Sequence, residues 1–376
     1  MPKTKLYGGI SILIGVTIGA GILALPHAVA NAGFLTGIID LAAIGIAMLV
    51  LNLCLGEITL RTKGNHQLTG YCEKYLGKTG KHLMGASMVI GIYGAIIAYT
   101  IGGGQSIAQI FGGNNWLWST IFFLIGMAII YKGLGALEKS EFTMEIIKLA
   151  TFALIIALIF FSGKINSLNW TRFELNNLFL PYGVILFAYL GTTAIPEMRE
   201  EMRGNWKQLK IAIIAGSTIP IFVYLLFAIA VVGIGGQKTA EIATITIGQM
   251  LGTTGLVLAN IFAVLAMFTS FIALGYGLKE MYHYDYKINV NTSFLLTFAI
   301  PQLLLLVGMQ SFAKTLEITG AISGGLAGVL VVLMHIRAKK FGDRKPEYSI
   351  NPTLLGSILL MAMFIIGAMF TIRGLI

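Results

Sequence analysis

Long apolar runs separated by short polar loops make up almost the whole chain. A membrane-spanning helix needs about 20 apolar residues, and eleven runs approach that length. They begin near Leu6, Gly33, His82, Asn115, Phe142, Leu178, Leu209, Gly252, Thr292, Phe312 and Thr353. Because helices satisfy their own backbone hydrogen bonds in lipid, the pattern predicts an all-α integral membrane protein with eleven transmembrane helices.

The first and the sixth apolar runs are interrupted near their middle. The first carries Gly15, Gly19 and Gly21, and the sixth carries Gly191 followed by Pro196. Inside a helix, Gly is roughly 1 kcal/mol and Pro roughly 3 kcal/mol less favourable than Ala, so both runs are expected to unwind. Small residues also allow helices to pack closely, and the first run alone does not distinguish these two interpretations.

Two interrupted helices five spans apart are typical of an inverted-repeat transporter. The repeats are expected at about 6–162 and 178–336, with an extra helix at about 351–373, in a single domain of 1–376. A broken helix exposes amides that attract a carboxylate and carbonyls that attract an ammonium group. An α-amino acid carries both groups, so it is the expected cargo. A channel fits less well, because two breaks favour one enclosed site over a continuous pore.

Composition and charge support a membrane location. Hydrophobic residues make up 56% of the chain and charged residues only 11%, against roughly a quarter in soluble domains. Most of the 26 Lys and Arg residues lie in loops on the side of the N-terminus. By the positive-inside rule, the N-terminus is expected in the cytoplasm and the C-terminus outside the cell membrane. The expected partner is therefore the lipid bilayer rather than nucleic acid, and no protein partner is predicted.

Motifs of enzymes are absent from the sequence. It contains neither H-E-x-x-H nor G-x-S-x-G, and Cys54 and Cys72 have no disulfide or metal-binding spacing. We therefore expect neither catalysis nor a cofactor. The sequence does not separate a transporter from a sensor that binds an amino acid without moving it.

One stretch carries a family resemblance. The sequence Ile-Gly-Ala-Gly-Ile-Leu-Ala-Leu-Pro at 18–26, followed by Ala-Asn-Ala-Gly-Phe at 30–34, resembles the amino acid/auxin permeases. These belong to the amino acid, polyamine and organocation superfamily, which shares the leucine-transporter fold. The resemblance covers nearly the whole chain and is similar to the prokaryotic aromatic amino acid permease branch. It implies a 5+5 inverted repeat with discontinuous helices 1 and 6.

The resemblance also implies a substrate site where the two breaks meet. The carboxylate would meet the backbone of 17–21, and the amino group would meet carbonyls of both breaks. The third span would bound the side-chain pocket near Tyr93, although Tyr99 lies on the same helix and the register stays open; the eighth span would bound another side. The implied substrate-binding residues are Thr17, Ile18, Gly19, Ala20, Gly21, Tyr93, Phe187, Ala188, Tyr189, Leu190, Gly191 and Thr192.

Two sets of residues compete as the site of the coupling ion. Lys148, about two turns into the fifth span, resembles the lysine that takes the place of sodium in proton-coupled members of the superfamily. It also lies near enough to the surface to extend there. The alternative is a sodium site formed by Gly15, Ile18, Ala266, Thr269 and Ser270. Thr and Ser hydroxyls on a membrane helix also bond back to their own helix, which offers a structural explanation of the same residues.

These observations predict a permease that imports neutral amino acids by proton-coupled symport with alternating access. Small residues at 191–194 leave space for a sizeable neutral side chain, with aromatic and branched ones as candidates. Proton coupling is favoured because a lysine ammonium in the site would exclude a metal ion. The alternatives are a sodium-coupled symporter and a non-transporting sensor.

Overall fold

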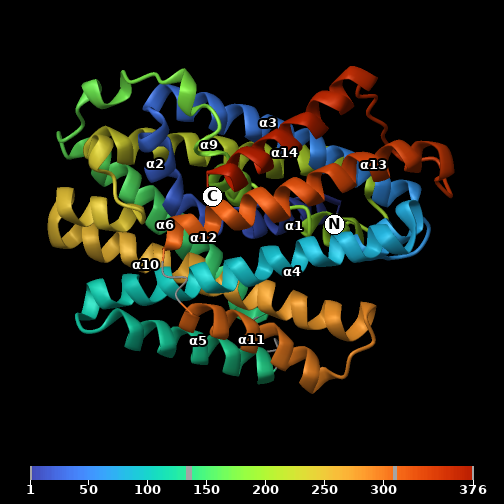
Figure 1. The fold of residues 1–376 in the computed structure, drawn as a ribbon, viewed down its shortest axis with the longest axis horizontal. Helices are drawn as coiled ribbons and strands as arrows, with labels where there is room; N and C mark the ends of the chain where they lie inside the picture. The colour runs from blue at the N-terminus through green and yellow to red at the C-terminus, as the bar shows by residue number, and fades with distance from the viewer. Residues whose placement is uncertain (1, 133–137, 308–310, 375–376) are drawn as a thin grey trace.

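Helices form the whole framework of the protein. The structure, a computed structural model, describes the backbone of residues 2–132, 138–307 and 311–374, and the side chains of 5–132, 146–307 and 311–374. Within these ranges the helices are joined by loops and short 3-10 or π turns, with no β-strand (Figure 1). In chain order the helices are α1 (Pro2–Thr17), α2 (Gly21–Ala32), α3 (Phe34–Arg61), α4 (Leu68–Phe111), α5 (Asn115–Lys132), α6 (Glu138–Phe161), α7 (Tyr182–Ala188), α8 (Ala194–Glu201), α9 (Leu209–Gly235), α10 (Ala243–Glu280), α11 (Val290–Val307), α12 (Phe312–Thr319), α13 (Gly325–Phe341) and α14 (Leu354–Arg373).

Most of these helices are long and apolar enough to cross a membrane. By length and composition the described residues contain 8 such helices, or 9 when α1 and α2 count as one bent span. The predicted number of eleven is therefore not confirmed. The difference lies in α6, where the apolar stretch Ile146–Phe161 is shorter than a span, and in α7 and α8, which are short. The predicted start of the fifth span at Phe142 lies outside the residues whose side chains are described.

Both predicted interruptions are present. α1 ends at Thr17 and α2 begins at Gly21, and the two helices are bent by 56°. α7 ends at Ala188 and α8 begins at Ala194. The prolines are not where the helices stop: Pro26 lies inside α2, and Pro196 lies in the first turn of α8, where its missing N–H costs nothing. The breaks therefore follow the glycine-containing segments.

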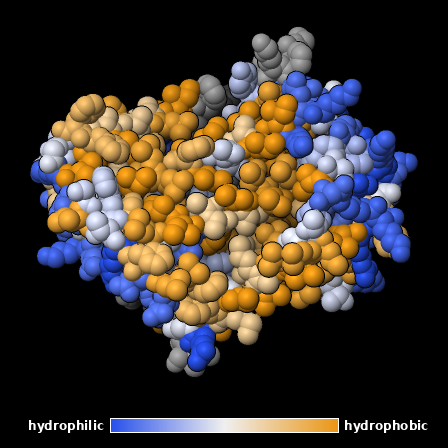
Figure 2. Space-filling model, turned by 90° about the horizontal axis from the view of Figure 1, so that it is seen from above, coloured by the Kyte–Doolittle hydropathy of each residue, from blue (hydrophilic) through white to orange (hydrophobic). Residues whose placement is uncertain are grey.

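The broken helices run through the interior, whereas the outer helices present apolar side chains outward. Ile22, Leu23 and Leu25 of α2 are fully buried, while Leu154 of α6 and Leu303 of α11 are more than half exposed. Figure 2 shows apolar residues across the middle of one face and hydrophilic residues gathered toward two ends. An exposed apolar surface of this extent belongs in lipid. The chain is a multi-pass membrane protein.

One end of the molecule gathers the N-terminus and the loops after α3 and α8. Lys5 Nζ donates to the carbonyl of Arg203 at 2.7 Å, and Arg199 donates to the carbonyl of Gly64 at 2.7 Å. These are loops in which the basic residues are concentrated. The structure thus brings together the segments that the positive-inside rule assigns to one side of the membrane.

Candidate functional site

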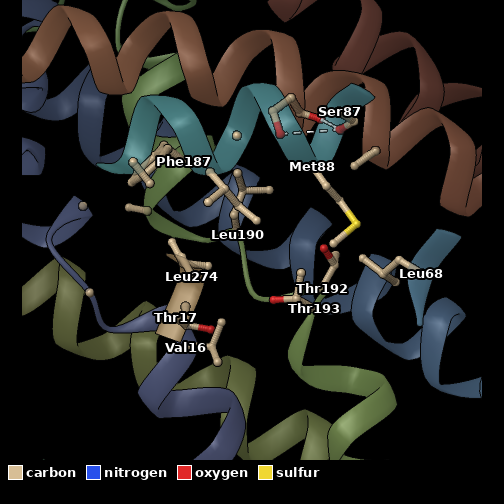
Figure 3. Close-up of a pocket in the computed structure, with 18 of the residues that line it drawn as sticks. Val16, Thr17, Leu68, Ser87, Met88, Phe187, Leu190, Thr192, Thr193 and Leu274 are labelled. Carbon is tan, nitrogen blue, oxygen red and sulfur yellow. Dashed lines mark hydrogen bonds between the residues drawn. The ribbon is translucent and has the colours of Figure 1, made fainter. Parts of the chain in front are cut away.

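A cavity of about 710 Å³, its opening included, lies beside the two helix breaks. It is bounded by the end of α1, the start of α2, the middle of α4, the segment from α7 to α8, α10 and α13. Figure 3 shows labelled side chains from several of these elements around one space. The lining residues are Val16, Thr17, Gly19, Gly21, Leu68, Met84, Ser87, Met88, Gly91, Ile92, Ala95, Tyr99, Phe187, Ala188, Leu190, Thr192, Thr193, Leu274, Ser323 and Ala327.

The first break presents the start of a helix to this cavity. The N-terminus of α2 lies at Gly21, and no side chain among the described residues caps it. The first amides of a helix have no partner within the helix and carry a partial positive charge. Gly19 and Gly21 both line the cavity, so the backbone here is not screened by side chains. This end of α2 is suited to a carboxylate.

The second break presents the end of a helix. α7 stops at Ala188, and the carbonyls of its last turn carry a partial negative charge. The Phe187 carbonyl accepts from the Leu190 amide at 3.1 Å, and the Ala188 carbonyl accepts from the Tyr224 hydroxyl at 2.9 Å. A carbonyl oxygen has two lone pairs, so each keeps one for a further donor. This end of α7 is suited to an ammonium group.

The two breaks lie against each other. A Cβ atom placed on Gly21 would come within 2.7 Å of Ala188 Cα, which is closer than side chains tolerate. The positive start of α2 therefore adjoins the negative end of α7. A ligand with a carboxylate and an ammonium group on one carbon could place the carboxylate at the start of α2 and the ammonium group at the end of α7.

The rest of the lining is apolar or carries hydroxyl groups. Across the cavity, Ser87 Oγ donates to the carbonyl of Ser323 at 2.8 Å, which joins α4 to the π turn before α13. The hydroxyls of Thr192 and Thr193 lie on the segment between α7 and α8 (Figure 3). None of the described lining residues is charged. The cavity therefore favours a neutral side chain, and its hydroxyls can bond to a polar group.

Not all of the predicted substrate-binding residues reach the cavity. Those that line it are Thr17, Gly19, Gly21, Phe187, Ala188, Leu190 and Thr192, and those outside the lining are Ile18, Ala20, Tyr93, Tyr189 and Gly191. The Tyr93 hydroxyl donates to the Leu296 carbonyl at 2.8 Å and lies 2.9 Å from the Tyr282 hydroxyl. Tyr99, the other candidate on this helix, lines the cavity. The two tyrosines are six positions apart on the helix, which is not a whole number of turns, so they face different directions.

The sequence predicted that this part of α4 bounds the pocket, but it did not identify Ser87 and Gly91 or the wall formed by α13. Ser87 and Gly91 lie one turn apart on α4, and Ser323 lies in the glycine-rich segment 320–325. Small and hydroxyl-bearing residues one turn apart on a membrane helix favour contact with a partner helix, and this signal was available in the sequence. It does not tell which helix is the partner.

Lys148 lies at the first break rather than at the surface. The residue is 1% exposed, and its Nζ donates to the Ile18 carbonyl at 3.1 Å. Ile18 belongs to the unwound segment between α1 and α2. The side chain therefore does not extend to water, and its ammonium contacts backbone that adjoins the cavity.

The residues of the alternative sodium set are engaged in part by their own helix. Thr269 Oγ1 donates to the carbonyl of Leu265 at 3.0 Å and approaches that of Ala266 at 3.3 Å. This is the back-bonding that the sequence allowed as an alternative. Ser270 is closer to the break: a Cβ atom on Gly19 would meet Ser270 Oγ at 2.8 Å.

Comparison with known proteins agrees with this architecture. The profile of the tryptophan/tyrosine permease family matches residues 2–371. The tyrosine-specific transport system 1 of Haemophilus influenzae is 26% identical, with 98% of each chain covered. Glutamine transporter 2 of Aliivibrio fischeri is 24% identical, over 88% of this chain and 87% of that protein.

A solved structure shares the fold. The crystal structure of MhsT in complex with L-phenylalanine superposes with a TM-score of 0.70 at 13% identity and covers 97% of each chain. The resemblance to permeases with the leucine-transporter fold is thereby confirmed. The chain belongs to the tryptophan/tyrosine permease family, and it is a transporter of amino acids rather than an enzyme.

Proposed function

We propose that the protein imports neutral amino acids by proton-coupled symport. The observation that carries this proposal is the contact of the buried Lys148 ammonium with the Ile18 carbonyl. An ionisable side chain inside the bilayer is a candidate carrier of the coupling proton, and a change in its charge would alter the first break. An ammonium group at this carbonyl also supplies the positive charge that a sodium ion would bring.

The substrate is proposed to be a neutral amino acid whose side chain carries a polar group. The relatives above are named for tyrosine and glutamine, which are both neutral and both able to form hydrogen bonds through the side chain. The lining of the cavity is uncharged and contains hydroxyls such as Ser87 and Thr192. In the proposed pose, the carboxylate meets the amides at 19–21, and the ammonium meets the carbonyls of Phe187 and Ala188.

Alternating access is proposed because the cavity extends from the two breaks toward one side of the molecule only. Beyond the breaks it is lined by Leu68 and Met84 from the first half of α4 and by Thr193 before α8, all on the N-terminal side of the molecule. On the other side of the site, the rings of Tyr99 and Phe187 pack edge to face with centroids 6.4 Å apart. With the N-terminus in the cytoplasm, as proposed from the basic loops, this arrangement leads inward and is closed outward.

Uptake by proteoliposomes tests the proposal. Labelled tyrosine, tryptophan and glutamine would be offered with an inward proton gradient, an inward sodium gradient or neither. We expect accumulation only with the proton gradient. Accumulation driven only by sodium would move the coupling site to Gly15, Ile18, Ala266, Thr269 and Ser270. Binding without uptake or exchange in any condition would identify a sensor.

Tyr99 and Tyr93 provide a paired test of the cavity. Removal of one hydroxyl that contacts the site costs about 1 kcal/mol, so Tyr99→Phe is expected to raise the KM for uptake by roughly fivefold. Tyr93→Phe removes a hydroxyl bonded to Leu296 outside the cavity, and it should lower thermal stability while leaving KM within twofold of the wild type. Equal KM values in both variants would exclude Tyr99 from the substrate site.

A further inference from the structure

A tyrosine outside the cavity joins the two helix breaks. Tyr224 lies in the middle of α9 and is fully buried. Its hydroxyl is 2.5 Å from the carbonyl oxygen of Thr17, the last residue of α1, and 2.9 Å from that of Ala188, the last residue of α7. One side chain of a continuous helix thus contacts the ends of both half-helices.

The Tyr224 hydroxyl has one proton to donate but two carbonyl oxygens close enough to accept it. A tyrosine hydroxyl donates one hydrogen bond, yet two carbonyl oxygens lie within bonding distance. The Thr17 carbonyl also accepts from the Gly19 amide at 2.9 Å, so it keeps a donor when Tyr224 turns toward Ala188. The Tyr224 proton is therefore shared between two acceptors, one at each helix break.

We infer that Tyr224 is a positioning residue for the amino group of the substrate, an inference that rests on the proposed amino acid site. Ala188 lines the cavity, and its carbonyl is one of the two proposed to bind the ammonium group. The Tyr224 hydroxyl holds this carbonyl in place through one lone pair, and the second lone pair is left to accept from the ammonium group. The same hydroxyl contacts the Thr17 carbonyl, so it also ties the end of α7 to the end of α1, which is the half-helix on the proposed inward route.

The surroundings contain a matched control. The ring of Tyr189 packs beside that of Tyr224 with centroids 5.1 Å apart, and its hydroxyl is buried with no hydrogen-bond partner among the described residues. Tyr189→Phe and Tyr224→Phe each remove one buried hydroxyl from the same aromatic pair. Only Tyr224→Phe deprives two backbone carbonyls of their shared donor.

Binding of two related ligands tests the inference. Ligand-induced thermal stabilisation of the purified protein would be titrated with L-tyrosine and with 3-(4-hydroxyphenyl)propionate, which has the same ring and carboxylate but no amino group. Tyr224→Phe is expected to weaken L-tyrosine binding about tenfold and to leave the binding of the deaminated analogue within twofold of the wild type. Tyr189→Phe should change neither.

Each outcome decides for or against the role of Tyr224. Unchanged binding of L-tyrosine, or equal weakening of both ligands, would overturn it, because a general distortion of the site does not select for the amino group. A lower melting temperature with unchanged binding would assign Tyr224 a purely structural role. Absence of uptake by the wild type would overturn the proposed transport instead, and the titration would still measure the contact with the amino group.

Discussion

Replacement of Lys148 by alanine is expected to abolish proton-driven accumulation of the substrate. The variant loses the buried lysine at the first break, whose Nζ donates to the Ile18 carbonyl. Uptake with an inward proton gradient should then fall to the level measured with no gradient. The measurement is the initial rate and the final accumulation of labelled tyrosine in proteoliposomes.

Lys279 offers a control for the loss of a buried lysine. Its side chain is 11% exposed, contacts Glu280 at 3.4 Å and lies over the ring of Tyr276, away from the cavity lining. Lys279→Ala should therefore keep proton-driven accumulation even where it lowers the melting temperature. Intact accumulation by Lys148→Ala would exclude Lys148 as the coupling residue.

Replacement of Gly21 by alanine should separate the two breaks and reduce uptake by tenfold or more. The added Cβ would lie 2.7 Å from Ala188 Cα and 2.9 Å from Ala188 Cβ, so the backbone of α2 or α7 must shift. Overpacking of this kind costs about 1–3 kcal/mol, and here the strain falls on the groups proposed to hold the carboxylate and the ammonium. Uptake and substrate-induced thermal stabilisation would both be measured.

Gly277 provides the matching substitution without a clash. It lies inside α10, and a Cβ atom there would have no neighbour within 4 Å. Alanine is about 1 kcal/mol better than glycine in a helix interior, so Gly277→Ala should transport normally and be no less stable. Wild-type uptake by Gly21→Ala would show that transport does not depend on the close contact between the two breaks.

The interruption of the helices could be predicted because its cause is local. Glycine-containing segments of low helix propensity lie in apolar runs, and both breaks occur there, at 18–20 and 189–193. The expectation of a site for a carboxylate and an ammonium group followed from these breaks, since every helix end exposes unpaired amides or carbonyls. The number of spans could not be confirmed, because α6, α7 and α8 are too short to be recognised by length and hydropathy.

Tertiary packing decided which side chains point into the cavity. Tyr93 and Tyr99 are the same residue type in the same apolar run, so the sequence could not tell which of them faces the cavity. The packing of α4 against its neighbours places Tyr99 there and Tyr93 against Leu296. Tyr224 gave no signal at all, because a tyrosine in an apolar run is ordinary. Its contact joins residues separated by 207 and 36 positions in the chain.

The sequence by itself determined the membrane location and the two breaks, because apolar length and helix propensity act over neighbouring residues. Tertiary structure alone decided that the start of α2 lies against the end of α7, that Lys148 contacts Ile18 and that one hydroxyl joins both breaks. These contacts join distant segments, and the close packing of whole helices, which no local pattern encodes, brings them together.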